Sequence, residues 1–198
     1  LDEDFRQPYA DDLPQAAVYK GADYLLFYGR GPVKWSYSTS LATFVHENNP
    51  YSSYGYYFLS DTSPVKTLAK ETSVTGASLQ VNTYDDYFVH EKDQVSVNKS
   101  GRELFGESFS LNTGQTFPFA VPGITDDPAK ISFRFIAKPT TGQALVILTA
   151  GTQPLLNASI PRSSIDDSYT KALELSRTVS WNGAKTPDVQ VGITYSRN

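Results

Sequence analysis

Apolar and polar side chains alternate strictly in the C-terminal half of the chain. In residues 189–195, valine, valine, isoleucine and tyrosine alternate with glutamine, glycine and threonine. A period of two gives a β-strand one buried face and one exposed face. The same alternation predicts a strand at residues 173–181, where Arg177 is the one charge on the apolar side. Further strands are predicted at residues 131–137, 145–149 and 155–160.

The first half is also predicted to be β-structure, but its apolar residues come in short continuous runs. Residues 24–28 (Tyr-Leu-Leu-Phe-Tyr) are apolar on both faces, as in a buried central strand, and residues 54–59 form a similar run. Residues 79–81 and 95–97 are weaker strand candidates. No segment repeats its apolar residues with the 3.6-residue period of a helix. These patterns predict an all-β fold, an antiparallel β-sandwich or jelly-roll domain preceded by an aromatic-rich β-lobe.

A polar stretch at residues 90–102, which ends close to an Asn-Lys-Ser-Gly sequence, is the least structured junction in the chain. We therefore place a boundary there. We expect an aromatic-rich β-lobe over residues 1–97 and a β-sandwich over residues 98–198, either as two domains or as one continuous unit. The length of 198 residues is sufficient for both arrangements.

Composition and charge argue against several classes of function. The net charge is −4, and the 17 basic residues are interspersed with 21 acidic ones, so they form no stripe for nucleic-acid phosphates. No apolar run approaches the roughly 20 residues that cross a bilayer. The absence of cysteine removes disulfides, thiolate nucleophiles and cysteine-based zinc sites, and it suits a protein exported to a bacterial surface. Because the chain begins at Leu1 without an apolar leader, we expect a mature form or a piece of a longer protein.

Side chains that carry enzymatic chemistry are sparse. His46 and His90 are the two bases of the neutral pH range, and no serine lies in a Gly-x-Ser-x-Gly turn. Residues 90–93 (His-Glu-Lys-Asp), with Glu107 further along, offer metal-ligating atoms but lack the second histidine of a His-Glu-x-x-His site. Ion pairing at a strand end is the alternative for these residues. We expect no catalytic residue and no metal site here, and a hydrolase whose triad forms only in space is the competing hypothesis.

Adjacent aspartates occur four times, each time near turn residues. Paired carboxylates in β-loops can hold calcium through their oxygen atoms, but aspartate is also a common turn residue in its own right. None of the pairs has the spacing of a known calcium loop, so we expect no cofactor, with calcium at one pair as the alternative. The pairs are Asp11-Asp12, Asp85-Asp86, Asp126-Asp127 and Asp166-Asp167.

Aromatic residues are concentrated between positions 35 and 57. Such rings form either the core and cross-strand pairs of a sheet or an exposed platform that stacks on sugars. We expect core and cross-strand pairs, with a carbohydrate-binding β-sandwich module of a surface protein as the alternative function. The residues are Trp35, Tyr37, Tyr51, Tyr54, Tyr56 and Tyr57.

Three stretches carry a resemblance to a known family. They are residues 22–35 (ADYLLFYGRGPVKW), residues 48–59 (NNPYSSYGYYFL), and residues 87–93 (YFVHEKD) together with 100–109 (SGRELFGESF). In this order they resemble the region ahead of the protease domain in the type IX secretion sortases, which are gingipain-like C25 peptidases of Bacteroidota. The resemblance covers the first half of the chain well, whereas the second half agrees only in its strand pattern.

The resemblance implies a non-catalytic N-terminal module of a protein at the bacterial cell surface or outer membrane. In this family a cysteine and a histidine of a downstream caspase-like domain remove the sorting domain from secreted cargo and attach the cargo to anionic lipopolysaccharide. Because this chain has no cysteine, no catalytic residue carries over. The implied partners are the downstream peptidase domain of the same parent chain and an outer-membrane anchoring protein of the secretion system.

Turns between rigid strands usually carry recognition, so we predict a partner-binding surface at residues 29–35 and 90–107. We expect that this chain neither binds nucleic acid nor spans a membrane. The candidate partner-binding residues are Arg30, Lys34, Trp35, His90, Glu91 and Glu107.

Overall fold

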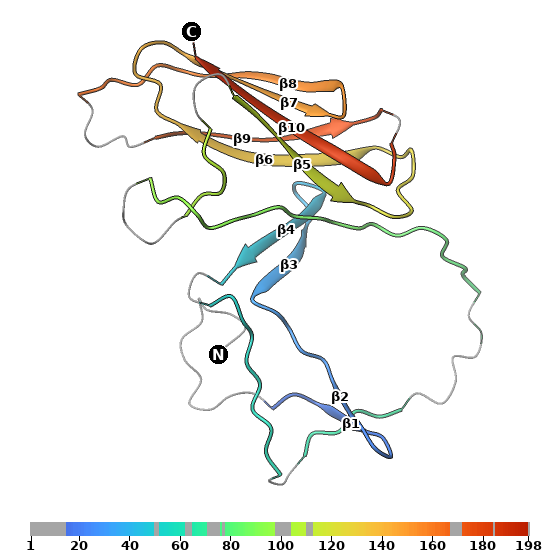
Figure 1. The fold of residues 1–198 in the computed structure, drawn as a ribbon. Coiled ribbons are helices and arrows are strands. Elements are labelled where there is room, and N and C mark those ends of the chain that lie inside the picture. Colours follow the sequence, from blue (N-terminus) through green and yellow to red (C-terminus); the bar gives the residue numbers. More distant parts are fainter. Residues whose placement is uncertain are drawn as a thin grey trace. The chain divides into compact units, whose positions relative to one another are not determined.

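The structure of the protein, a computed structural model, consists of β-strands joined by turns and extended segments (Figure 1). The described residues hold ten strands and no helix, and all ladders between strands are antiparallel, so the predicted all-β antiparallel fold is confirmed. Among these residues, none belongs to a helix that is long and apolar enough to cross a membrane. The structure describes residues 15–49, 52–61, 65–70, 76, 78–97, 104–109, 113–166, 172–183 and 185–197.

The chain divides into two compact units, Leu1–Tyr87 (unit 1) and Phe88–Asn198 (unit 2). Each unit is described by itself below. Whether a boundary between residues 97 and 98 separates two independently folding domains stays a prediction.

Unit 2 contains a four-stranded antiparallel sheet in the order β5-β10-β7-β8. Both edge strands of this sheet carry a proline, Pro118 in β5 and Pro154 in β8. Proline is tolerated at sheet edges, where its missing N–H removes no ladder hydrogen bond, and it discourages pairing with a further strand. The four strands are β5 (Thr113–Ala120), β7 (Ala144–Ala150), β8 (Gln153–Ile160) and β10 (Asp188–Arg197).

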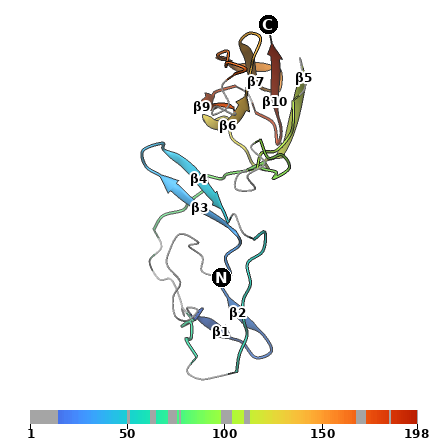
Figure 2. The ribbon, with the colours of Figure 1, turned by 90° about the vertical axis from the view of Figure 1, so that its left-hand side faces the viewer.

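A second sheet of two strands, β6 (Ala129–Ala137) and β9 (Leu173–Trp181), packs against the first (Figure 2). Phe135 of β6 stacks on Tyr195 of β10 with ring centroids 5.5 Å apart. The alternation predicted from the sequence appears as burial, because every second residue of β7 lies in the core between the sheets. Unit 2 is therefore a β-sandwich. The buried β7 residues are Ala144, Val146, Leu148 and Ala150.

The one charge on the apolar side of β9 is accommodated without burial. Arg177 lies opposite Phe133 in the β6–β9 register, but its side chain is exposed. Its guanidinium Nη1 donates a hydrogen bond to the carbonyl oxygen of Ser176 at 2.7 Å. The charged end therefore keeps its solvation, and the apolar pattern of the strand is interrupted at one position.

Unit 1 contains two small antiparallel ribbons, β1–β2 and β3–β4. No described residue of this unit is fully buried, whereas all eleven buried apolar residues belong to unit 2. An isolated two-stranded ribbon is only marginally stable in water, so unit 1 lacks a core of its own within the described residues. The strands are β1 (Val18–Lys20), β2 (Leu25–Phe27), β3 (Val33–Ser38) and β4 (Thr43–Asn48).

Several predictions for the first half are wrong. Residues 24–28 contain a strand, β2, but it is three residues long and exposed on both faces rather than buried. Residues 54–59 and 79–81 form no strand, because within the described residues no segment pairs with their backbones. Residues 95–97 contribute a single bridge, from Val95 to Phe105. Apolar composition favours a strand, but a ladder also requires a neighbouring backbone in register.

Candidate functional site

In unit 2, the carboxylate of Glu107 holds two side chains of the segment that enters the unit. Nε2 of His90 lies 2.7 Å from Oε1 of Glu107, and Nζ of Lys92 lies 3.1 Å from the same oxygen. An ionised carboxylate only accepts hydrogen bonds, so His90 donates through Nε2. The His90 ring also contacts Phe117 of β5, at a centroid distance of 4.8 Å. For His90 and Glu107, the ion-pairing alternative is the one that the structure shows.

Backbone hydrogen bonds reinforce this cluster. The N–H groups of Val95 and Phe105 each donate to the carbonyl oxygen of the other residue at 2.8 Å, and the N–H of Gln94 donates to Phe105 at 2.9 Å. Gly106 lies so close to the entering segment that a Cβ there would be 3.4 Å from the carbonyl oxygen of Lys92. The backbones of residues 92–95 and 105–106 therefore run side by side, which brings residue 107 next to the entering segment.

Hydrogen bonding keeps the carboxylates of this region ionised. Burial raises the pKa of Glu107, but the hydrogen bonds from His90 and Lys92 together have the larger effect and hold the pKa below its ordinary value. Glu174 of β9 pairs with Arg134 of β6 at 2.7 Å, and this hydrogen bond lowers the pKa of Glu174. Neither carboxylate is suited to exchange protons at neutral pH, where a general acid or base needs a raised pKa.

The described residues contain no group of three or more histidines, aspartates or glutamates placed to hold a metal ion. Glu91 is exposed and takes part in an interaction of its own. Of the aspartate pairs, Asp86 accepts a hydrogen bond from the N–H of Tyr87 at 2.8 Å, and Asp127 accepts one from the hydroxyl of Thr125 at 2.8 Å. Asp127 thus has the role of a bend residue, whereas Asp86 lies in an extended segment. The expectation of no cofactor, with calcium at one pair as the alternative, stays a prediction. Asp11-Asp12, Asp167 and Tyr51 lie outside the described residues.

In unit 1, Trp35 of β3 lies in an aromatic cluster. Its ring centroid is 4.0 Å from that of Tyr87 and 4.9 Å from that of His46, its register partner on β4. On the same face, Tyr37 pairs with Phe44 at 5.4 Å. The prediction of cross-strand aromatic pairs is confirmed at these positions, whereas the prediction that the rings form a core is wrong for Tyr37, Tyr54, Tyr56 and Tyr57, which are exposed. Two rings already pack on Trp35, which leaves little of its face for a sugar.

The other predicted residues of unit 1 do not share a face with Trp35. Lys34 precedes Trp35 in β3, so its side chain lies on the opposite face of the ribbon, where its register partner is Glu47. Arg30 lies in the loop before β3 with an exposed side chain. Its backbone N–H donates to the hydroxyl of Tyr57, which in turn donates to the carbonyl oxygen of Arg30 at 2.9 Å.

Three of the six predicted residues, Arg30, Lys34 and Trp35, belong to unit 1. The other three belong to unit 2, where His90 and Glu107 meet. That the six form one partner-binding surface stays a prediction. The sequence analysis grouped Lys92 with His90 and Glu107 in its ion-pairing alternative, although Lys92 was not among the candidate partner-binding residues. It missed Phe117 as a member of the Glu107 cluster. Phe117 gave no signal, because only the fold brings β5 to this segment.

Unit 1 exposes an extended set of apolar side chains. In β2, Leu25, Leu26 and Phe27 have exposed fractions of 48%, 56% and 48%. The ring of Tyr57 lies 5.3 Å from that of Phe27, so residues 54–59 run next to β2. We refer to these exposed residues as the unit 1 apolar surface. They are Tyr24, Leu25, Leu26, Phe27, Tyr28, Tyr54, Tyr56, Tyr57, Phe58 and Leu59.

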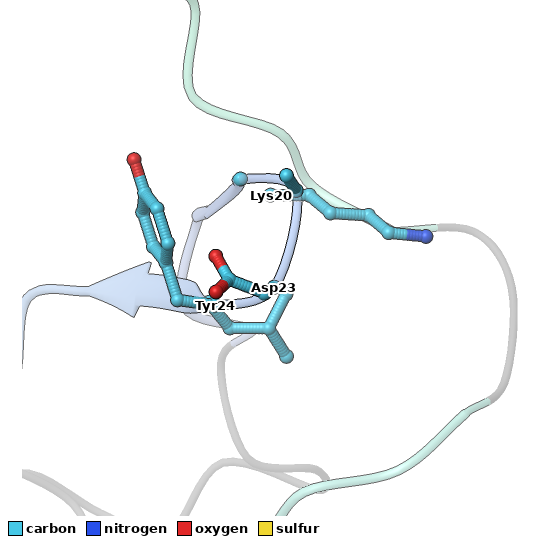
Figure 3. Close-up of a pocket in the computed structure, with 6 residues that line it drawn as sticks. Lys20, Asp23 and Tyr24 are labelled. Carbon is cyan, nitrogen blue, oxygen red and sulfur yellow. The ribbon is translucent and has the colours of Figure 1, made fainter.

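A shallow hollow lies at the turn that joins β1 to β2 (Figure 3). It is lined by residues 20–25 alone, and in Figure 3 the side chains of Lys20 and Tyr24 point in different directions. The N–H of Gly21 donates to the carbonyl oxygen of Tyr24 at 2.8 Å, and the Tyr24 ring occupies the space where a side chain at position 21 would lie. Within the part of the chain that the structure describes, no second segment lines the hollow, so this feature is a tight turn rather than a ligand site.

Comparison with known proteins gives an informative similarity to a solved structure. No protein-family model and no curated protein matches the chain. The chain is similar to the crystal structure of dimeric latent PorU from Porphyromonas gingivalis, with a TM-score of 0.74 and 29% sequence identity. The match covers 100% of this chain and 19% of that chain, so this chain spans about one fifth of that protein's length. The resemblance seen in the sequence is thus supported as far as a PorU-like region with this fold.

Proposed function

We propose that this chain is a non-catalytic, N-terminal β-module of an exported PorU-like protein at the bacterial cell surface, and that unit 1 docks the module onto the peptidase domain of its parent. The unit 1 apolar surface is the observation that carries this proposal. About half of each side chain of β2 is exposed, and no described residue of unit 1 is buried. Extended apolar patches on folded proteins mark interaction surfaces, because exposed apolar area is costly in water.

The state of the ionisable side chains supports a role without catalysis. The chain has no cysteine and two histidines. His46 packs on Trp35, and His90 donates its Nε2 proton to Glu107. A histidine that activates a nucleophile needs a serine, threonine or cysteine within hydrogen-bond reach, and Glu107 occupies that position at His90.

A domain of the same parent protein is the partner that these observations favour. The similar PorU chain is about five times as long as the region that this chain matches, so most of that protein lies outside the module. A covalently joined domain meets unit 1 at a high effective concentration, so an apolar contact of modest intrinsic affinity is sufficient. An outer-membrane anchoring protein is the second partner, and the experiment below separates the two.

The test is a binding titration between this chain and the separately produced peptidase domain of its parent. We expect saturable binding with a negative heat-capacity change, the signature of apolar burial. Leu26→Asp should weaken binding at least about tenfold, because it places a charge in an apolar contact. The matched control is Ile165→Asp, since Ile165 is 73% exposed but belongs to unit 2.

Three results would overturn this assignment. One is a folded chain that does not bind the peptidase domain at all. Another is equal loss of binding in the Leu26→Asp and Ile165→Asp variants, which would remove the role of unit 1. Binding of the anchoring protein alone, sensitive to Leu26→Asp, would transfer the surface to that partner.

Exposed tyrosines favour a second function, carbohydrate binding. Tyr54 and Tyr56 have exposed fractions of 70% and 58%, and their ring centroids are 6.4 Å apart. The rings are inclined by 54°, so they offer two stacking directions rather than one flat platform. A saturable NMR shift on titration with lipopolysaccharide glycan, lost in Tyr54→Ala and Tyr56→Ala, would support this function. No shift at millimolar glycan would exclude it.

A further inference from the structure

The chain passes from unit 1 to unit 2 through a connector that is fixed at both ends. Tyr87, the last residue of unit 1, packs its ring 4.0 Å from that of Trp35. His90, three positions later, is held in unit 2 by Glu107. Phe88 and Val89 lie between these two fixed residues, and each is 45% exposed. The connector is thus two residues long.

Where the chain enters unit 2, the first contacts along the sequence are made by side chains, and backbone hydrogen bonds follow. Glu107 takes one hydrogen bond from His90 and one from Lys92. The first backbone bonds, those of Gln94 and Val95 to Phe105, come later in the chain. Before these backbone bonds, residues 90–93 are held on unit 2 by the Glu107 carboxylate and by the contact of the His90 ring with Phe117.

The position of the first fixed residue decides how far the connector can reach. An extended chain spans at most about 3.3–3.6 Å per residue. From residue 87 to residue 90 this allows roughly 10–11 Å, whereas from residue 87 to residue 94, the first residue held by a backbone bond, it allows roughly 23–25 Å. Release of His90 and Lys92 would thus more than double the reach of the connector while the Val95–Phe105 bridge and the sandwich remain intact.

We propose that Glu107 is a positioning residue that fastens the connector to unit 2 and thereby limits the freedom of unit 1. Glu107 acts here through His90 and Lys92, which lie on the connector side. Another ion pair of unit 2, Arg134 with Glu174, has the same length of 2.7 Å but joins β6 to β9 and includes no residue of the connector. It is therefore a matched control for the loss of an ion pair in the same unit.

The test compares Glu107→Gln with Glu174→Gln in the full chain. Because the chain has no cysteine, Thr39→Cys and Asn157→Cys supply two unique positions for spin labels, one exposed in each unit. Electron paramagnetic resonance then measures the distribution of distances between the labels. Hydrogen exchange is measured in parallel at the amides of Gln94 and Val95.

We expect Glu107→Gln to broaden the distance distribution and to speed exchange at Gln94 and Val95 about ten- to hundredfold, as the loss of charge-assisted hydrogen bonds predicts. Glu174→Gln should change neither quantity. An unchanged distribution in Glu107→Gln, an equal change in Glu174→Gln, or a distribution that is already broad in the wild type would overturn the proposal. If Glu107→Gln fails to fold, the double variant His90→Gln and Lys92→Gln removes the same bonds from the connector side and must give the same result.

Discussion

Because the two units differ in burial, we predict that a leucine-to-alanine substitution mainly lowers the stability of the chain in unit 2 and mainly weakens docking in unit 1. Leu148 of β7 is 0% exposed and packs in the core of unit 2. Leucine-to-alanine changes at such sites cost about 2.7–5 kcal/mol, because apolar contacts are lost and a cavity remains. Leu26 of β2 is 56% exposed, so less than half of its transfer free energy is realised, and Leu26→Ala should cost about 1 kcal/mol or less.

Intrinsic fluorescence can measure unit 2 by itself. The chain has two tryptophans, Trp35 in unit 1 and Trp181 in the core of unit 2. In a Trp35→Phe background, urea unfolding followed by emission therefore reports on Trp181. Leu148→Ala should lower the unfolding free energy by about 3 kcal/mol, which corresponds to about 10–15 °C in the thermal midpoint. Leu26→Ala should leave this transition within about 0.5 kcal/mol of the parent value.

For the affinity of docking, we expect Leu26→Ala to have the larger effect and Leu148→Ala the smaller one. If the peptidase domain covers Leu26, Leu26→Ala should weaken binding roughly tenfold, the equivalent of about 1.4 kcal/mol. Leu148→Ala should leave the affinity unchanged at temperatures where unit 2 is folded. In the free chain, unfolding of unit 1 is followed by the emission of Trp35 in a Trp181→Phe background. A Leu26→Ala cost in that transition as large as the cost of Leu148→Ala in unit 2 would show that unit 1 has a buried core, and the reasoning behind the docking surface would fail.

Three further outcomes follow from particular contacts. The wild type should be more stable than Glu107→Gln at about pH 7, and this difference should vanish as the pH falls through the lowered pKa of Glu107. The reason is that the protonated carboxyl no longer carries the charge that favours folding. Urea unfolding at about pH 7 and about pH 3 measures the difference. Gly151 in the β7–β8 turn has a φ of +56°, so Gly151→Ala should cost about 1–2 kcal/mol in thermal unfolding, whereas Gly31→Ala, at ordinary φ and with open space, should cost little. Gln153→Ala should remove the acceptor of the Trp181 indole N–H at 3.1 Å, with a loss of about 1 kcal/mol and a shifted Trp181 emission maximum.

The sandwich was predictable from the sequence because its strands are long and have one buried face. The alternation at residues 173–181 and 189–195 corresponds to β9 and β10, with correct faces along nearly the whole of both strands. β5 was missed because glycine, threonine and Pro118 mask its alternation, although Phe117 and Phe119 are two positions apart. Its place at the sheet edge explains why a proline is compatible with it.

The candidate site was less predictable, because its residues are joined by tertiary contacts. The sequence placed His90 and Glu107 together as a metal site or an ion pair, but a separation of seventeen positions could not decide between the two. In the structure, the bridge between Val95 and Phe105 brings them together as an ion pair. In unit 1, the sequence contains an alternation of apolar and polar residues that predicts β3, but the sequence analysis did not use it. Val33, Trp35 and Tyr37 alternate with polar residues as a strand requires, and they form β3.

For the continuous apolar runs of unit 1, the sequence correctly predicted a strand within residues 24–28 but wrongly predicted that this strand is buried. An apolar run such as residues 24–28 indicates that burial of both faces of the segment is favourable, but it does not indicate which part of the protein or of a partner buries them. In the sandwich, the partner is a second sheet of the same unit, so burial follows from the fold. In unit 1, the described residues provide no such layer, and β2 keeps about half of each side chain exposed. The proposed docking accounts for this combination of core-like composition and surface exposure, because a partner would then supply the burial that the sequence of β2 favours.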